Sequence, residues 1–171
     1  MLAGRLRELE QAAVVRRRSL PPPAASRVYE LTERGLELEP VILELGRWGS
    51  RAPFPGGDAG IGADAVAIAL KTLFSPAAAG GLEASYALLL GADGFRVRMA
   101  GGRLELARGE AVGPDALIEA RPGTLAALLW HGLPADHAER TGELRIEGSR
   151  RAATRFLRLF PLPADRYSAG A

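Results

Sequence analysis

The sequence has 171 residues, 47% hydrophobic and 25% charged, which is typical of globular domains and excludes a fibrous repeat or a largely disordered chain. It contains no cysteine, which excludes disulfides, thiol nucleophiles and thiolate metal sites. The longest apolar runs are too short to cross a membrane, and no secretory signal pattern opens the sequence. We therefore expect a soluble cytoplasmic protein of one or two small domains.

The excess positive charge lies in the first third of the chain. Residues 1–51 carry nine arginines and seven glutamates, whereas the remaining 120 residues carry 13 charges of each sign. Residues 50–62 are rich in glycine and proline and have no hydrophobic periodicity. We predict that they form a linker between a basic segment, residues 1–49, and a second domain, residues 63–163.

The basic segment predicts a helix, a hairpin and a long helix, in that order. Apolar residues repeat at helical spacing over residues 2–13. A short strand then starts at Val14-Val15, followed by Arg16-Arg17-Arg18, and it is joined through a basic tip to a returning strand at residues 27–31. Thr32 is a candidate N-cap for the long helix, and Pro40 should kink that helix or divide it.

Six arginines of this segment are candidates for phosphate contacts. A guanidinium group stays charged and can pair with phosphate through two hydrogen bonds, and a winged helix presents such groups on one helix and an adjacent hairpin. The alternative is a solvated basic surface with Glu8, Glu10 and Glu30 as neighbours. The candidates are Arg5, Arg7, Arg16, Arg17, Arg18 and Arg27.

About fifty residues resemble the HxlR-like winged-helix regulators. The resemblance is carried by residues 2–18, by Tyr29-Glu-Leu-Thr-Glu-Arg-Gly35 and by Arg47-Trp-Gly49. The resemblance implies a recognition helix, a wing hairpin and a dimerisation helix. It also implies that Arg5 faces the DNA groove and that the hairpin arginines contact the phosphate backbone of the DNA. A complete domain of this family has two further helices before the recognition helix, and this sequence begins inside that helix.

The predicted long helix carries more apolar surface than the short basic segment can cover. Winged-helix readers also use two-fold symmetry to contact paired half-sites. We therefore predict a homodimer, joined through Leu36, Val41, Leu45 and Trp48.

The second domain predicts a sheet with packed helices. Helices are expected at residues 63–74 and 124–131 and from the cap at Ser149 through an apolar stripe that ends at Phe160. Strands are expected at 85–90, 95–99, 103–107, 116–120 and 143–147. The predicted fold class is therefore α+β: a partial winged helix, then a five-stranded, mostly antiparallel sheet covered by helices.

No catalytic constellation or cofactor motif is evident. His131 and His137 lie six residues apart across a glycine and a proline, which matches no helical metal spacing and is better explained by a surface loop. The pairs Gly56-Gly57 and Gly101-Gly102 lack the strand and helix context of a dinucleotide site. We predict no metal, no cofactor and no enzyme activity.

Apolar side chains of the second domain could line a cavity between sheet and helices, or fill an ordinary packed core. Residues 94–109, 114–116 and 144–150 resemble the sterol carrier protein 2 fold, within a match over about residues 60–163. That resemblance implies an apolar tunnel that holds lipids or fatty acyl groups. The candidate ligand-binding residues are Phe95, Met99, Leu104, Trp130, Phe156 and Phe160.

Two functions are consistent with these patterns. The first is a transcriptional regulator of the HxlR type, which binds DNA as a dimer and whose C-terminal domain binds an apolar small molecule or a partner protein. The second is a lipid- or apolar-ligand-binding protein that does not bind DNA, in which residues 1–49 serve only for dimerisation.

Overall fold

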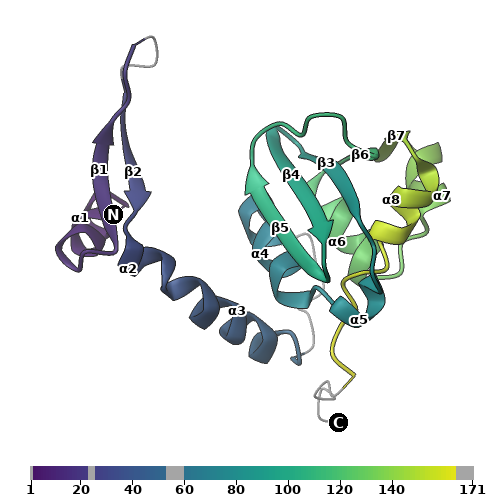
Figure 1. The fold of residues 1–171 in the computed structure, drawn as a ribbon, viewed down its shortest axis with the longest axis horizontal. Coiled ribbons are helices and arrows are strands. Elements are labelled where there is room, and N and C mark those ends of the chain that lie inside the picture. Colours follow the sequence, from purple (N-terminus) through teal and green to yellow (C-terminus); the bar gives the residue numbers. More distant parts are fainter. Residues whose placement is uncertain (1, 23–25, 53–59, 165–171) are drawn as a thin grey trace. The chain divides into compact units, whose positions relative to one another are not determined.

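The computed structural model describes residues 2–22, 26–52 and 60–164. The chain divides into two compact units, Met1–Leu45 and Gly46–Ala171, which are described in turn (Figure 1). The predicted domain boundaries at residues 49 and 63 stay predictions. Residues 53–59 of the predicted linker and residues 23–25 of the predicted hairpin turn lie outside the described residues.

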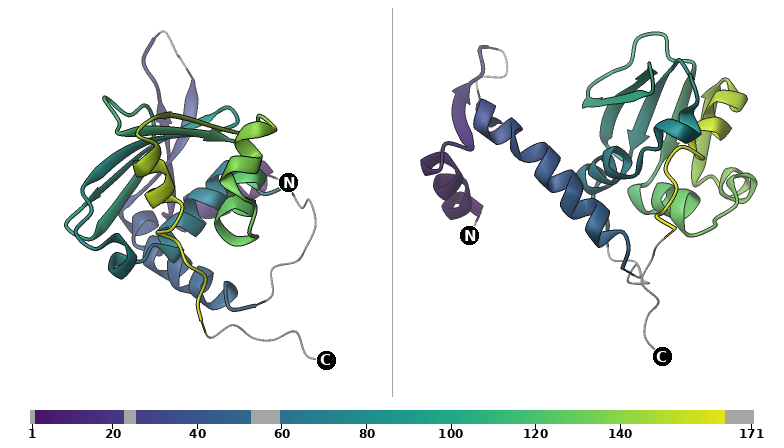
Figure 2. Two further views of the ribbon diagram at one scale, coloured as in Figure 1. Left: turned by 90° about the vertical axis from the view of Figure 1, so that its right-hand side faces the viewer. Right: turned by 60° about the horizontal axis from the view of Figure 1, so that its bottom comes forward.

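The first unit has the predicted order of helix, hairpin and helix. Helix α1 (Leu2–Gln11) precedes the antiparallel strands β1 (Val15–Ser19) and β2 (Arg27–Leu31), in which Val15 lies opposite Leu31. Figure 2 shows α1 beside the base of this hairpin, where the amide of Val14 donates to the carbonyl of Leu9. The turn between α1 and β1 places Ala13 at φ +56°, a left-handed conformation that a non-glycine residue rarely adopts.

The long helix is divided, as Pro40 predicts. Helix α2 (Glu33–Leu36) begins at Thr32, whose Oγ1 accepts a hydrogen bond of 3.1 Å from the amide of Gly35, so the predicted N-cap is confirmed. Helix α3 (Leu38–Gly49) follows after one residue. Proline has no amide hydrogen and its ring meets the carbonyl four residues earlier, so Pro40 cannot continue a helix that contains Leu36.

The second unit contains the predicted five-stranded sheet. Its strand order is β5-β4-β3-β6-β7, and every neighbouring pair is antiparallel except β3 and β6. The α+β fold class is therefore confirmed. The strands are β3 (Ala84–Leu90), β4 (Asp93–Ala100), β5 (Arg103–Arg108), β6 (Ala116–Ala120) and β7 (Leu144–Gly148).

Helices cover one face of this sheet, and Figure 1 shows α4 and α6 behind the strands. Along β4, Phe95, Val97 and Met99 are buried while Arg96 and Arg98 are exposed, because successive side chains of a strand point to opposite faces. None of the helices in the described part of the chain is long and apolar enough to cross a membrane. The helices are α4 (Ala63–Leu73), α5 (Pro76–Ala79), α6 (Pro122–Trp130), α7 (Ala135–Arg140) and α8 (Arg150–Phe156).

Two of the helix predictions need correction. The segment around His137 was predicted as a surface loop, but it contains α7, whose six residues are too few to give a periodic pattern. The last helix was predicted to run to Phe160, but α8 ends at Phe156. Pro161 explains the early end, because its ring would meet the carbonyl of Leu157 in a continuing helix.

The core lies between the sheet and the helices α4, α6 and α8. Phe156 is fully buried, and its ring centroid lies 5.0 Å from those of both Tyr86 and Phe160. Burial raises the pKa of the Tyr86 hydroxyl, which donates a hydrogen bond of 3.3 Å to the carbonyl of Ala152. These contacts join β3 to the last helix of the chain.

Gly148, the last residue of β7, should tolerate no side chain. It has φ +80°, and an added Cβ would lie 2.7 Å from the carbonyl oxygen of Asp115. We expect Gly142→Ala, at φ +73° with no atom within 4 Å of the added Cβ, to cost about 1–2 kcal/mol from backbone strain alone. Gly148→Ala should cost clearly more, measured by urea unfolding. Equal losses would contradict the close approach of Gly148 to Asp115.

Candidate nucleic-acid interface and ligand site

The arginine run lies within strand β1, not at the hairpin tip. The short strand predicted to start at Val14-Val15 is confirmed as β1, which pairs with β2 over five residues, from Val15 to Ser19, and so includes the three arginines. Arg16 lies opposite Glu30, and Arg17 lies opposite Tyr29. Cross-strand pairing therefore extends the backbone of the arginines and points their side chains alternately to the two faces of the hairpin.

On one face of the hairpin, Glu30 lies between two arginines. The Nε of Arg16 donates to one carboxylate oxygen at 2.6 Å, and an Nη of Arg18 donates to the other at 3.1 Å. These hydrogen bonds, the one from Arg16 foremost, lower the pKa of Glu30. One negative charge thus compensates half of the positive charge on this face.

On the opposite face, Arg17 has two partners. Its Nε donates to the hydroxyl of Tyr29 at 3.0 Å, its guanidinium carbon lies 5.5 Å from the centroid of the Tyr29 ring, and an Nη lies 3.1 Å from a carboxylate oxygen of Glu10. The hydrogen bond to Tyr29 and the charge of Glu10 raise the pKa of Arg17, so the group stays protonated. Glu10 lies near the end of α1, so this ion pair also links the helix to the hairpin.

The remaining candidate arginines are more loosely held. Arg5 makes an exposed ion pair of 3.1 Å with Glu8 on the same helix. The side chains of Arg7 and Arg27 are exposed, and neither makes a hydrogen bond or an ion pair with another residue in the described ranges. The six arginines therefore do not form one cluster, because two lie on α1 and the hairpin arginines lie on different faces.

Thr32 holds the base of the hairpin, a role that the capping pattern alone did not reveal. Its hydroxyl donates to the carbonyl of Ala13 at 2.6 Å while its oxygen accepts from the amide of Gly35. Gly35 is buried, and a Cβ at this position would overlap the carbonyl oxygen of Val14. The turn after α1, the end of β2 and the start of α2 therefore meet at one hydroxyl group and one glycine.

Large apolar side chains are exposed on the helices of the N-terminal segment. The residues predicted to join a dimer, Leu36, Val41, Leu45 and Trp48, have exposed fractions of 56%, 62%, 62% and 65%. On α1, Leu2 and Leu9 are exposed as well. Apolar surface of this extent is unusual for a monomeric soluble protein and is typical of an interface.

The predicted ligand-binding residues come together in the second unit. Phe95, Met99, Phe156 and Phe160 belong to one buried cluster, and Leu104, which lies opposite Met99 in the sheet, packs against it half-buried. The indole Nε1 of Trp130 donates to the carbonyl of Phe160 at 3.0 Å. These side chains pack against one another in this structure, and half-buried Leu128, Leu133, Ile146 and Leu157 form the apolar wall of a groove of about 320 Å³ beside them.

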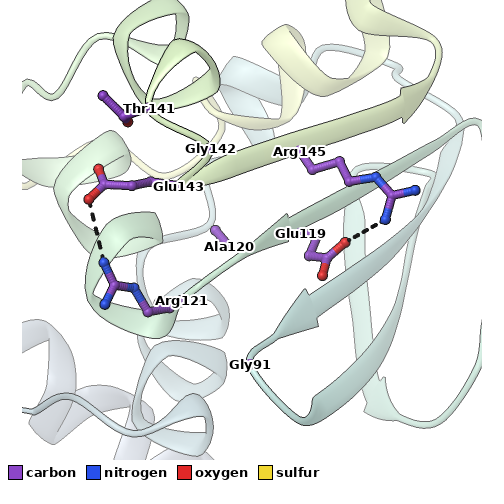
Figure 3. A pocket seen from close by; sticks show the side chains of 8 residues that line it. All are labelled: Gly91, Glu119, Ala120, Arg121, Thr141, Gly142, Glu143 and Arg145. Atoms are coloured by element: carbon purple, nitrogen blue, oxygen red, sulfur yellow. Dashed lines mark hydrogen bonds and ion pairs between the residues drawn. The ribbon is translucent and has the colours of Figure 1, made fainter.

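A second hollow, of about 540 Å³, lies where β6 and β7 meet the loop after α7 (Figure 3). Its charged side chains are paired with one another: Arg121 lies 3.4 Å from Glu143, and Arg145 lies 3.2 Å from Glu119. Across the described ranges, no three histidine or carboxylate side chains are grouped as a metal site requires. The paired charges leave this hollow without an evident reactive group.

The N-terminal segment matches a known family. Residues 1–53 match the HxlR-like helix-turn-helix family. A segment of 56 residues, 33% of this chain, is 43% identical to the HTH-type transcriptional regulator YodB of Bacillus subtilis (strain 168). The match spans half the length of that regulator. The winged-helix resemblance of the N-terminal segment is thereby confirmed.

The second unit has solved neighbours at low sequence identity. The sec-alkylsulfatase Pisa1 from Pseudomonas sp. aligns with a TM-score of 0.57 and 14% identity, covering 63% of this chain and 18% of that protein, so the likeness concerns the fold alone. Sterol carrier protein 2 domains are also among the neighbours. The ubiquinone synthesis protein UbiJ-SCP2 aligns with a TM-score of 0.44 and 16% identity, covering 75% of this chain and 91% of that protein. Palmitated SCP2L2 from Aedes aegypti aligns with a TM-score of 0.47 and 14% identity, covering 57% of this chain and 92% of that protein.

Gly35 should be essential for the base of the hairpin. We expect Gly35→Ala to destabilise the N-terminal unit by about 1–3 kcal/mol, because the added methyl group displaces the carbonyl of Val14. Gly4→Ala is the matched control, since its Cβ meets no atom within 4 Å and alanine favours helix α1. Hydrogen exchange of the β1 and β2 amides measures the effect. Unchanged exchange in Gly35→Ala would contradict the role assigned to this contact.

Proposed function

We propose that this protein is a transcriptional regulator of the HxlR type that binds DNA as a homodimer in the cytoplasm and is not an enzyme. Its C-terminal unit would bind an apolar small molecule or a partner protein. The observation that carries the proposal is the arginine-bearing hairpin, which lies inside the segment that matches the HxlR-like family.

The proposed DNA contact uses the wing arginines Arg16, Arg17, Arg18 and Arg27 on the phosphate backbone, with Arg5 and Arg7 on the recognition helix. In the free protein, Glu30 accepts hydrogen bonds from Arg16 and Arg18. A phosphate oxygen can accept the same hydrogen bonds, so DNA would compete with this carboxylate for the two guanidinium groups. The competition predicts weak and strongly salt-dependent binding.

Replacement of the three strand arginines tests this contact. In Arg16→Gln/Arg17→Gln/Arg18→Gln, the affinity for duplexes of different sequence should fall about equally, and the slope of log K against log salt should decrease by about 1 for each phosphate that the variant no longer neutralises. Fluorescence anisotropy across a salt series measures both quantities. Arg98→Gln/Arg103→Gln/Arg140→Gln, which removes the same charge from exposed positions of the second unit, is the matched control.

If Arg16→Gln/Arg17→Gln/Arg18→Gln, called the wing variant below, leaves the slope of log K against log salt unchanged, the result would favour a function without DNA binding. The carboxylate partners of Arg16, Arg17 and Arg18 are the observation that supports this alternative, because paired arginines are also what a solvated surface contains. The protein would then bind an apolar ligand without binding DNA, and the N-terminal segment would serve for dimerisation.

The exposed face of α3 supports the proposed dimer. We expect light scattering to give a mass of twice 18.1 kDa, and Val41→Glu/Leu45→Glu to reduce it to 18.1 kDa, because two carboxylates cannot be buried in an apolar contact. Ile68→Glu/Val112→Glu, at exposed apolar residues outside this helix, should leave the mass unchanged. A monomeric wild-type protein would contradict the dimer.

The proposed apolar ligand would enter the core lined by Phe95, Met99, Leu104, Trp130, Phe156 and Phe160. The groove beside Leu128, Leu133, Ile146 and Leu157 supports this proposal, because it brings solvent to side chains that pack on that core. Burial of the ligand's apolar area would supply the affinity, at about 25 cal/mol per Å² before association costs.

Tryptophan fluorescence tests the uptake of such a ligand. In Trp48→Phe, Trp130 is the one remaining indole, and we expect a saturable emission shift on titration with a long-chain fatty acid, because the ligand would disturb the Trp130–Phe160 contact. The variant Trp130→Phe retains Trp48 on the exposed face of α3, so it reports whether the fatty acid associates with that helix instead. No shift in Trp48→Phe would remove ligand binding from the proposal and leave a partner-binding domain.

A further inference from the structure

A second basic surface lies in the C-terminal unit, on helix α8 and the turn that follows it. A hollow of about 570 Å³ is lined there by Arg150, Arg151, Thr154, Arg155 and Arg158. All five residues are exposed, and no acidic residue lines the hollow. Four guanidinium groups and one hydroxyl group therefore surround a space that is accessible to solvent.

Two of these arginines are fixed by contacts behind the hollow. Arg150 lies 2.5 Å from a carboxylate oxygen of Glu139 and 2.9 Å from one of Asp136, both on α7. Arg155 donates a hydrogen bond of 2.8 Å to the carbonyl of Ala79 at the end of α5. These contacts hold the walls of the hollow, and the carboxylates of α7 compensate the charge of Arg150.

The other two arginines are free to bind a ligand. Within the part of the chain that the structure describes, the side chains of Arg151 and Arg158 make no hydrogen bond and no ion pair. Both line the same hollow as Thr154 and Arg155, Arg151 from the first turn of α8 and Arg158 from the turn that follows its end at Phe156. The uncompensated positive charge of this hollow is complementary to an anion.

The hollow lined by Arg150, Arg151, Thr154, Arg155 and Arg158 is called the α8 hollow below. We propose that it binds phosphate groups of duplex DNA, as a second contact in addition to the wing. Arginine forks match phosphate oxygens through paired hydrogen bonds, and the hydroxyl of Thr154 adds a further donor. A membrane surface fits less well, since none of the exposed large hydrophobic residues of the described chain lies on α7, β7 or α8. The inference rests on the proposed function in one respect, namely that DNA is a ligand of this chain.

The test uses the full-length chain and a duplex of about 20 base pairs in fluorescence anisotropy across a salt series. In Arg151→Gln/Arg158→Gln, we expect the affinity at about 0.1 M salt to fall about tenfold and the salt slope to decrease by about 2, because two phosphates are no longer neutralised. Neither side chain holds another element, so the fold should be retained, which the unfolding midpoint verifies. Arg98→Gln/Arg103→Gln removes the same charge from the open face of the sheet and should have a much smaller effect.

Equal effects of the two double variants would overturn the inference, because they would indicate a response to net charge alone. The wing variant keeps the two proposals apart. If DNA affinity falls only in the wing variant, the α8 contact is wrong and the proposed function stands, and if it falls only in the α8 variant, the wing contact is wrong. Vesicles of phosphatidylglycerol and phosphatidylcholine form a second arm, in which loss of vesicle binding without loss of DNA binding would assign the hollow to a lipid surface and overturn the proposal.

Discussion

The hydroxyl group of Thr32 is the contact on which the N-terminal unit depends. It donates to the carbonyl of Ala13 and accepts from the amide of Gly35, so it joins the left-handed turn after α1 to the first turn of α2. Strand β2 enters this junction directly from the hairpin. A few polar contacts around a glycine therefore determine the direction in which the hairpin leaves α1. Apolar burial contributes little, since Val15 is the one buried large side chain among the described residues of this unit.

The hairpin combines strong positive charge with internal compensation. Strand pairing places Glu30 between Arg16 and Arg18, and it places Tyr29 beside Arg17. Such exposed ion pairs add little stability, but they order flexible arginine side chains before a ligand arrives. A phosphate that replaces the carboxylate would meet guanidinium groups already extended from the strand. In the proposed DNA contact the same carboxylate would lower the affinity, so the pairing would both order the arginine side chains and compete with the phosphate.

The C-terminal unit is stabilised differently, by an apolar core. Its helices cover one face of the sheet, and aromatic side chains of β3, α8 and the segment after α8 fill the space between them. The candidate ligand residues are therefore also the residues that stabilise the fold. Any ligand must replace contacts that Phe156 and Phe160 now make with each other. The basic side chains of α8 lie outside this core, but Arg150, Thr154 and Arg158 line both the α8 hollow and the groove beside Leu128, so the two proposed sites adjoin each other.

Local rules predicted much of this fold, but they did not predict pairing between distant parts of the chain. The cap at Thr32, the division before Pro40 and the alternation along β4 each follow from a few neighbouring residues. The extent of β1 does not, because Arg16–Arg18 become a strand only when residues 27–31 pair with them. The same holds for the candidate site: residue types indicated the arginines, but the shared partner Glu30 and the contact of Trp130 with Phe160 depend on tertiary structure.

The central claim is that DNA competes with Glu30 for Arg16 and Arg18. The most direct test is the dissociation constant of Glu30→Gln for a duplex of about 20 base pairs at about 0.1 M salt, with Glu147→Gln on the sheet face as the control for net charge. The amide keeps the shape of the side chain and removes the charge that competes with phosphate. We predict that Glu30→Gln binds DNA several-fold more tightly than the wild type and the control. Equal or weaker binding than the control would contradict the account.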